Sequence, residues 1–463
     1  MEEKDSLIDG YMKFLDAGKT ERECCAQIVS MAKEHGFKNL LETESLKAGD
    51  KVYVSKWGKA VALFQIGSGS IEEGMNILGA HIDSPRLDVK QNPLYESDFL
   101  VYLNTHYYGG IKKYQWVTMP LAIHGVVCKK DGSTVQVCVG EKDSDPVFCI
   151  SDILPHLAQK QMKETASDFI PGESLDLILG SEIPPVRFKD DSEDESKVEN
   201  KSDGEKSPKS GEKAKKGILK ILRESYGIEE EDFGSAELEI VPAGKARYMG
   251  FDRSLVLAYG QDDRSCAYTS AQAMLETAAK KRTTCCLCVD KEEIGSVGAT
   301  GMASHFFENA VSELLARLGN YSELTLRRCL NSSYMLSSDV NSAFDPQHSD
   351  LYDKPNSSFL NGGIVFNKYT GSRGKSGASD ASPEFIAKIR GLLSDAGVTY
   401  QMAELGKVDQ GGGGTIAYLA AKYGMYVLDA GVSVLSMHAP WEITAVEDLR
   451  QAFAAYKVFL GME

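Results

Sequence analysis

The sequence predicts an α/β fold in which helices cover both faces of a sheet, and three observations support it. The second half of the chain alternates strand-like and helix-like stretches, which is typical of such sheets. Several apolar, strand-like runs end in His, Asp or Glu, and ligands in these folds collect at the carboxyl ends of strands. Between about residues 93 and 187, short β-like runs divided by turn residues indicate an inserted β-rich module.

The composition limits the classes of protein. At 463 residues the chain is too long for one ordinary core, so we expect two domains or one large domain with an insertion. The net charge of −16 argues against a protein that binds nucleic acid or a membrane surface through a basic face. No run approaches the roughly 18 apolar residues that are needed to span a bilayer.

The N-terminus and the cysteines predict a cytoplasmic protein. The chain opens with MEEKD, and no apolar core of signal-peptide length follows. The ten cysteines include Cys24-Cys25 and Cys285-Cys286 in apolar surroundings, where we expect reduced, buried thiols. A zinc site around Cys288 is the alternative, but no paired C-x-x-C motif supports it.

The first elements are helices and then strands. Apolar residues recur at helical spacing over residues 6–34, and Thr20 with Glu23 predicts a capping box that starts the second half of this region. Residues 52–56 and 60–64 read as strands joined by a Gly turn.

A buried strand from about residue 75 then delivers His81 and Asp83. Strand alternation puts the two side chains on one side, so Asp83 can accept the proton of the ring nitrogen that faces away from a metal. A structural histidine is the alternative, and Ser84 and Pro85, which end the strand, favour a ligand.

We expect residues 93–244 to form the inserted β-rich domain, between segments 1–92 and 245–463 of the main domain. Within the insert, Leu154 begins a helical stretch, and the β-like runs cover residues 100–103, 122–127 and 134–138.

Residues 189–216 consist almost entirely of Lys, Glu, Asp, Ser and Gly. Such a composition cannot bury enough apolar surface to order itself, so it predicts a mobile surface loop. A basic nucleic-acid tail over residues 213–216 is the alternative. Helix is expected to resume at Ile218.

The second half supplies most of the sheet. Its predicted strands cover residues 255–264, 285–289, 334–340 and 425–429, and its predicted helices cover residues 265–280, 303–318, 387–396, 415–422 and 446–459.

Glu292 and Glu293 follow shortly after the predicted strand at residues 285–289. Two adjacent carboxylates at the end of a buried strand are costly unless their charge is compensated. A divalent metal explains the pair if one Glu ligates it and the other transfers a proton. A solvated acidic turn is the alternative.

The strand ends together suggest a two-metal site. Two histidines and three carboxylates are a suitable donor set for two zinc-like ions that share Asp262. Two such ions lower the pKa of a bridging water and polarise a carbonyl, and Glu292 is placed to take the proton of that water. The candidate ligands are His81, Asp262, Glu293, Asp339 and His438.

The chain resembles the aspartyl aminopeptidase and aminopeptidase I family of dinuclear zinc exopeptidases. The resemblance covers nearly all of the chain except residues 189–216, and it rests on GAHIDSP (79–85), QDDR (261–264), DKEEIGS (290–296), SSDV (337–340) and SMH (436–438).

The resemblance assigns a role to each candidate. It implies His81, Glu293, Asp339 and His438 as terminal ligands, Asp262 as the bridge, Glu292 as general base and Asp83 as the residue that orients His81. Asp262 is preferred to Asp263 because the family's bridging residue precedes an Asn or Asp. The metals are expected to be zinc, with Co²⁺ or Mn²⁺ as alternatives.

The resemblance also implies an architecture. It predicts a zinc-exopeptidase-like catalytic domain with a mixed sheet, interrupted by a β-rich dimerisation domain, and self-association into dimers and a tetrahedral dodecamer. In the family a neighbouring subunit's histidine completes the substrate site. His156 matches that region, although Lys160 stands where relatives carry a second His, and a histidine on a helix surface is the alternative.

Substrate specificity stays open at this point. Lys375 is the candidate cation for an acidic first residue, but its loop departs from the aspartyl pattern, so neutral first residues are equally expected. The glycine run at residues 411–414 lacks the Gly-Lys-Ser/Thr ending of a nucleotide loop, and we expect a close backbone approach beside the metal site.

The sequence therefore predicts an aminopeptidase that releases the first residue, acidic or neutral, from peptides with a free N-terminus. A related dinuclear deacylase or carboxypeptidase is the rival among metal hydrolases. From another class, the rival is a catalytically silent assembly protein, whose signature would be loss of Glu292 or of a ligand.

Overall fold

The computed structural model describes residues 5–181 and 213–463, and the chain divides into two compact units. Unit 1 comprises residues up to Pro85, Tyr108–Ile111 and Gly244–Glu463, and unit 2 comprises Arg86–Tyr107 and the described part of Lys112–Ala243. The sequence predicts that the chain passes from the main domain into the insert at residue 93. The structure places this boundary earlier because β5 (Arg86–Ser97) pairs with β10 (Ala236–Pro242) of unit 2 from its start.

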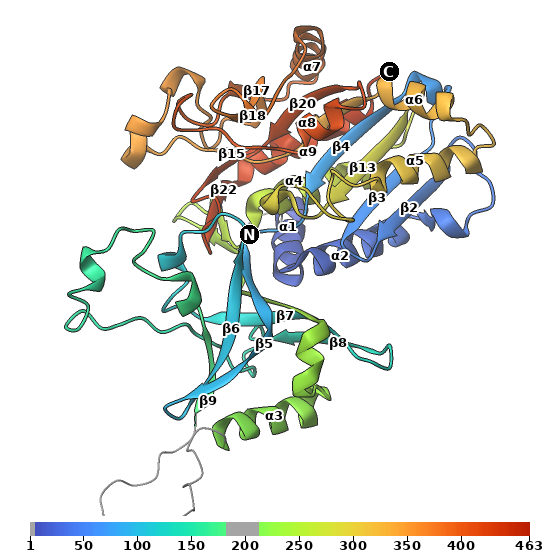
Figure 1. Cartoon of the computed structure of the whole chain (residues 1–463). Helices are drawn as coiled ribbons and strands as arrows, with labels where there is room; N and C mark the ends of the chain where they lie inside the picture. The colour runs from blue at the N-terminus through green and yellow to red at the C-terminus, as the bar shows by residue number, and fades with distance from the viewer. Residues whose placement is uncertain (1–4, 182–212) are drawn as a thin grey trace, which may run out of the picture. The chain divides into compact units, whose positions relative to one another are not determined.

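A mixed sheet forms the centre of unit 1 (Figure 1). Among its described residues, nine strands pair in the order β1-β2-β3-β13-β4-β14-β20-β16-β19. Their bounds are β1 (Lys38–Asn39), β2 (Lys51–Lys56), β3 (Ala60–Gln65), β4 (Met75–His81), β13 (Thr283–Val289), β14 (Tyr334–Ser337), β16 (Ile364–Asn367), β19 (Tyr400–Ala403) and β20 (Tyr426–Gly431). The inner four, β13, β4, β14 and β20, are parallel to one another.

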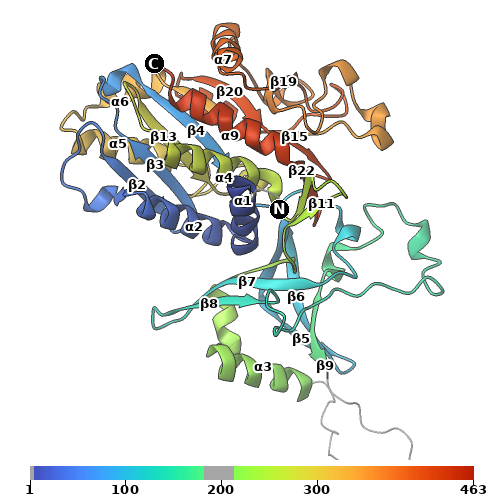
Figure 2. The same ribbon diagram turned by 180° about the vertical axis from the view of Figure 1, so that it is seen from behind.

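Helices cover both faces of this sheet, as the sequence predicted (Figures 1 and 2). Successive residues of β13 belong to different cores: Cys285 and Leu287 pack with one group of helices, and Cys286 and Cys288 with the other. This alternation explains why the strand is apolar throughout. One face carries α5 (Phe306–Arg317), α6 (Glu323–Asn331) and α8 (Ala417–Ala421), and the other carries α1 (Ser6–Ala17), α2 (Glu21–Glu34), α4 (Gln261–Glu276), α7 (Pro383–Asp395) and α9 (Val446–Leu460).

The predicted capping box of α2 is confirmed. The Thr20 side chain accepts a hydrogen bond from the Glu23 amide, and the Glu23 side chain accepts one from the Thr20 amide. The predicted helical region of residues 6–34 is two helices, because Gly18 ends α1 and Thr20 starts α2.

Unit 1 contains a second, smaller sheet with the strand order β11-β12-β22-β21-β15, and a separate hairpin of two strands. The bounds are β11 (Arg247–Met249), β12 (Leu255–Ala258), β15 (Asn341–Ser342), β21 (Ser433–Leu435) and β22 (Glu442–Ala445) for the sheet, and β17 (Tyr369–Ser372) and β18 (Ser376–Asp380) for the hairpin. Of these strands, only β12 corresponds to a predicted strand, at residues 255–264, and the second half of that prediction is wrong because α4 begins at Gln261.

Unit 2 is β-rich, as expected. Its described strands form one sheet in the order β8-β7-β10-β5-β6-β9. Besides β5 and β10, the bounds are β6 (Leu100–Tyr108), β7 (Leu121–Cys128), β8 (Thr134–Val139) and β9 (Leu177–Ser181). The helix predicted from Leu154 is wrong: residues 155–160 form turns, and a short 3-10 helix follows at Gln161–Lys163. Leu154 and Leu157 are exposed, so this stretch lacks the packing that stabilises most helices.

The charged segment 189–216 lies mostly outside the described residues. Its last four residues, 213–216, belong to α3 (Lys213–Tyr226), so the helix starts earlier than the predicted Ile218. Within the described ranges, no helix has the length and apolar character that crossing a membrane requires. All ten cysteines are free, and Cys24, Cys25, Cys285, Cys286 and Cys288 are buried as predicted.

Candidate metal centre

Three inner strands of the main sheet carry four of the predicted site residues to one edge. Because β13, β4 and β14 are parallel, their carboxyl ends meet there. His81 is the last residue of β4, Asp339 follows β14, and Glu292 and Glu293 follow β13. The positive φ of Lys291, 70°, turns the chain sharply as it leaves β13.

The smaller sheet supplies the other two candidates. Asp262 follows β12 and keeps non-helical dihedral angles at the start of α4. His438 lies in the loop between β21 and β22 and has a φ of 65°. Asp263, the alternative to Asp262, accepts a hydrogen bond from the amide of His81 through Oδ2 instead.

Asp262 lies between the two histidines. Its Oδ1 is 3.2 Å from Nε2 of His81, and its Oδ2 is 3.3 Å from Nε2 of His438. Asp339 Oδ1 is 3.9 Å from the same atom of His81, and Glu293 Oε2 is 3.5 Å from that of His438. These side chains form two groups of potential metal ligands that share Asp262.

The separations and charges fit two divalent metals. Ligand atoms at 2.0–2.1 Å from a tetrahedral zinc lie about 3.3 Å apart, close to the distances between these side chains. Glu293 Oε1 is buried and makes no hydrogen bond with any described residue. Burial and neighbouring acids raise the pKa of Glu293 and of Asp339 well above the usual range, so bound cations would stabilise their ionised forms.

Asp83 connects His81 to the Glu292-Glu293 turn. Its Oδ1 lies 3.3 Å from His81 Nδ1 and accepts a hydrogen bond from the Glu292 amide at 3.1 Å. Its Oδ2 accepts one from the Glu293 amide at 3.2 Å and another from the Tyr108 hydroxyl at 2.8 Å. One buried carboxylate therefore fixes the orientation of the histidine and the position of both glutamates.

Glu442 holds the other side of the site. Its Oε1 accepts a hydrogen bond from the His438 amide at 2.7 Å, and its Oε2 accepts one from the Asp262 amide at 3.0 Å. The Gly110 carbonyl lies 3.0 Å from Nδ1 of His438, so the proton on Nδ1 leaves Nε2 free to bind a metal.

The charges of the site shift the ionisation of its residues. Burial raises the pKa of Glu292 to about 7, and Asp262 and Asp83 add to the rise while His81 opposes it. Burial by itself lowers the pKa of His438, but the hydrogen bond to Asp262 opposes this effect. Together with the charges of the nearby acids, it raises the pKa to about 10. A carboxyl with a pKa near neutrality is suited to exchanging protons.

A cavity of about 1160 Å³ opens over these residues. Asp262, Glu292, Glu293, Asp339 and His438 lie in its wall, together with the β17–β18 hairpin and the glycines of residues 411–414. Backbone atoms of residues 405 and 371 occupy the places where side chains at 411 and 412 would lie, so a close backbone approach occurs at these two glycines. The cavity is large enough for a small peptide.

The two weaker candidates lie elsewhere. Lys375 is exposed at the turn of the β17–β18 hairpin, and the hairpin's cation in the cavity wall is Arg373. His156 is an exposed residue of unit 2, in the segment of turns that follows Leu154.

Comparisons with known proteins agree with this geometry. The family model of the aminopeptidase I zinc metalloproteases (M18) matches residues 14–460. The chain belongs to the M18 family of zinc aminopeptidases. A probable M18 family aminopeptidase 1 from Clostridium acetobutylicum is 55% identical and aligns with 100% of this chain and 96% of its own length.

Solved structures of M18 enzymes share the fold. The Thermotoga maritima M18 aminopeptidase gives a TM-score of 0.90 at 41% identity, covering 99% of this chain and 97% of its own. The structure of aminopeptidase I from Clostridium acetobutylicum gives a TM-score of 0.87 at 53% identity, covering 98% of this chain and 95% of its own. The dodecamer of mApe1 from S. cerevisiae gives 0.74 at 20% identity, with coverages of 98% and 96%, and shows the fold alone.

Two residues of the site gave little signal in the sequence. Glu442 occurs four residues after His438, which was the available hint, but its contact with Asp262 joins segments 180 residues apart. Tyr108 lies in the predicted insert but outside its predicted β-like runs, and the structure groups it with unit 1, where its hydroxyl donates a hydrogen bond to Asp83.

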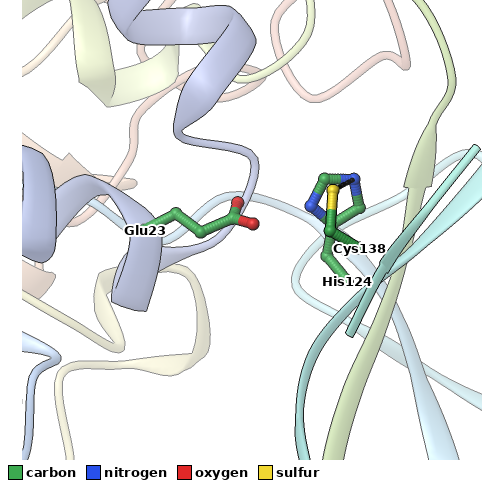
Figure 3. A group of neighbouring side chains, drawn as sticks. All are labelled: Glu23, His124 and Cys138. Carbon is green, nitrogen blue, oxygen red and sulfur yellow. Dashed lines mark hydrogen bonds between the residues drawn. The ribbon is translucent and has the colours of Figure 1, made fainter. Parts of the chain in front are cut away.

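A smaller group of potential ligands lies in unit 2. His124 and Cys138 face each other on β7 and β8, with Sγ 4.0 Å from Nε2 (Figure 3). The same nitrogen of His124 lies 3.3 Å from Glu141 Oε1. An ion pair between His124 and Glu141 accounts for this arrangement without a metal.

Proposed function

We propose that this M18 aminopeptidase hydrolyses the N-terminal residue, acidic or neutral, from short peptides at a site holding two divalent metals. The observation that carries the proposal is the pair of ligand groups that share Asp262, with Glu292 beside them in the cavity wall.

In this proposal His81 and Asp339 would hold one metal, Glu293 and His438 would hold the other, and both sites would share Asp262. Zinc is the expected metal, and Co²⁺ and Mn²⁺ are the alternatives. When bound, the two ions supply Lewis acidity that polarises the scissile carbonyl and lowers the pKa of water.

Glu292 is the proposed general base. Asp83 accepts a hydrogen bond from its amide, and Glu292 lies in the cavity wall beside the candidate ligands. Glu292 accepts a proton from the attacking water and gives it to the amine that leaves. Asp83 acts by position: it orients His81 and fixes the turn that carries Glu292.

Self-association belongs to the same proposal. Unit 2 exposes several apolar side chains along one segment: Val147, Ile153, Leu154, Leu157 and Met162. Exposed apolar groups of this kind are typical of subunit contacts. We propose dimers that assemble into a tetrahedral dodecamer, in which unit 2 mediates dimerisation and His156 serves the site of a neighbouring subunit.

A cytoplasmic location is also proposed, and the ten free cysteines support it. For the segment 189–216 we propose control of access to the active sites. Deleting its undescribed part should change the hydrolysis of long peptides relative to short ones, and unchanged kinetics for both would contradict this role.

The test of the function is Glu292→Gln. We expect the zinc-loaded variant to keep its metal and to lose turnover by about 10²–10⁴-fold, because the amide cannot accept a proton. Metal content is measured by mass spectrometry, and turnover is measured with aminoacyl substrates that carry Asp, Glu, Leu or Lys. The preferred substrate of this panel decides between acidic and neutral specificity.

The matched control is Glu313→Gln, at a half-exposed surface position of α5. It should retain wild-type turnover. The proposal fails if Glu292→Gln keeps full activity, or if N-acetylated substrates are cleaved as fast as free ones.

A further inference from the structure

Asp429 is a buried acid in the cavity wall that the proposed metal set and general base do not use. It lies in β20 and is 4% exposed. In the sheet register it pairs with Ser337, the last residue of β14, two residues before Asp339. Asp429 therefore lines the same cavity as the candidate ligands without belonging to either ligand group.

One oxygen of this carboxyl group lacks a partner. Asp429 Oδ1 makes no hydrogen bond with the residues that the structure describes. The hydroxyls of Thr415 and Ser337 interact with the carboxyl group, yet burial still raises the pKa of Asp429 to about 7. Asp429 also lines the cavity, and an unsatisfied carboxyl oxygen in such a residue is suited to a ligand that donates hydrogen bonds.

Asp448 shows what a buried acid with a structural role looks like in this chain. Its two oxygens accept hydrogen bonds from the amides of Asn361 and Gly363, and it lies outside the cavity wall. Protein donors thus satisfy both oxygens of Asp448, whereas Oδ1 of Asp429 has no such donor among the described residues.

The position of Asp429 identifies the donor. Asp429 and Glu292 line the same cavity. In a peptide, the α-amino nitrogen is two bonds from the carbonyl carbon that is attacked. A substrate placed for proton transfer to Glu292 therefore has its ammonium group within a few ångströms of the reacting carbon. An ammonium group is also the charge that a buried carboxylate attracts most strongly.

We propose that Asp429 binds the α-ammonium group of the peptide's first residue and so makes the enzyme select a free N-terminus. This inference rests on the proposed function. Asp429 acts as a specificity residue: it contacts the substrate without ligating a metal and without accepting the proton of the attacking water.

The test compares two hydroxamates on the zinc-loaded full chain by calorimetry. Leucine hydroxamate carries the α-amino group, and 4-methylpentanohydroxamic acid is the same molecule without it. Both offer the same metal-binding group, so the ratio of their dissociation constants reports recognition of the amine. We expect wild type to prefer leucine hydroxamate, and Asp429→Asn to reduce this preference about tenfold to a hundredfold.

Two variants complete the design. Asp448→Asn changes a buried acid outside the cavity wall and should leave the ratio of the two dissociation constants at its wild-type value. Asp429→Ser gives a second substitution at the same position. Both dissociation constants in a ratio are measured on the same variant, so a partial loss of folded protein affects them equally and leaves the ratio unchanged.

The outcomes separate the two proposals. If Asp429→Asn keeps the wild-type ratio, or if wild type does not distinguish the two compounds, the role of Asp429 is overturned while the metal centre stands. A variant that keeps the ratio but loses discrimination between lysine and leucine hydroxamates overturns it in favour of a side-chain subsite. If neither compound binds zinc-loaded wild type, the proposed function itself fails.

Discussion

Single residues outside the ligand set hold the ligands in place, and Glu442 is the clearest case. It is 1% exposed and accepts hydrogen bonds from the amides of both Asp262 and His438. Burial raises its pKa to about 8. Glu442 therefore fixes Asp262 and His438 relative to each other through their backbone amides, not through the side-chain atoms that would bind a metal.

We expect Glu442→Gln to weaken zinc binding about 10–100-fold, because a carboxamide nitrogen cannot accept one of the two amide hydrogen bonds. Competition with a chromogenic chelator measures the dissociation constant. Glu447→Gln, at the half-exposed start of α9, should leave it unchanged. Equal affinities for Glu442→Gln and wild type would show that Glu442 does not position the ligands.

The sequence predicts the candidate ligands and Asp83, but not every residue that supports them. An acid or histidine at the end of a buried strand is visible locally, because it interrupts an apolar run, as at His81 and Asp429. Glu442 and Tyr108 show no such contrast. Their partners come from distant segments, and only the folded sheets bring them together.

At the scale of elements, the N-terminal helices illustrate which local signals are reliable. The Thr20 capping box depends on groups three residues apart and was predicted correctly. The helix expected from Leu154 depended on apolar spacing alone and did not form. The helix α6, which starts at the N-cap Ser322, was not predicted, because its nine residues are too few for a clear periodic pattern.

Removal of the cap should destabilise the protein measurably. Thr20→Ala is expected to lower the free energy of unfolding by about 1 kcal/mol, because the Glu23 amide loses its acceptor. Urea denaturation of the zinc-loaded protein measures the change. Ser30→Ala, at an exposed position of the same helix, should cost less than about 0.5 kcal/mol. Equal losses in the two variants would contradict the capping role.

At the scale of the whole molecule, the order of strands assembles the site. Residues 81, 293 and 339 are far apart in the chain but lie at the ends of three adjacent parallel strands. The α/β class was predictable because alternation of strands and helices is a local pattern. The strand order, the smaller sheet and its placement of Asp262 and His438 were not, because pairing between distant strands leaves no local trace.

The proposed assembly predicts a mass. Light scattering after gel filtration should give about twelve times the 50.6 kDa of one chain. Leu157→Asp should lower this mass, because it places a charge among the exposed apolar residues of unit 2. Lys142→Asp, at an exposed position of the same unit, is the control. A single-chain mass for wild type would contradict the assembly.

The central claim, that Asp262 joins two metal sites, is tested most directly by counting metals. Wild type and Asp262→Asn are loaded with zinc and dialysed, and zinc per chain is measured by mass spectrometry. The shared position of Asp262 predicts about two ions per wild-type chain and fewer than about one in the variant, because both sites lose a ligand. Asp252→Asn, on the surface of unit 1, should keep both ions. One ion or none in wild type, or two ions retained by Asp262→Asn, would contradict the claim.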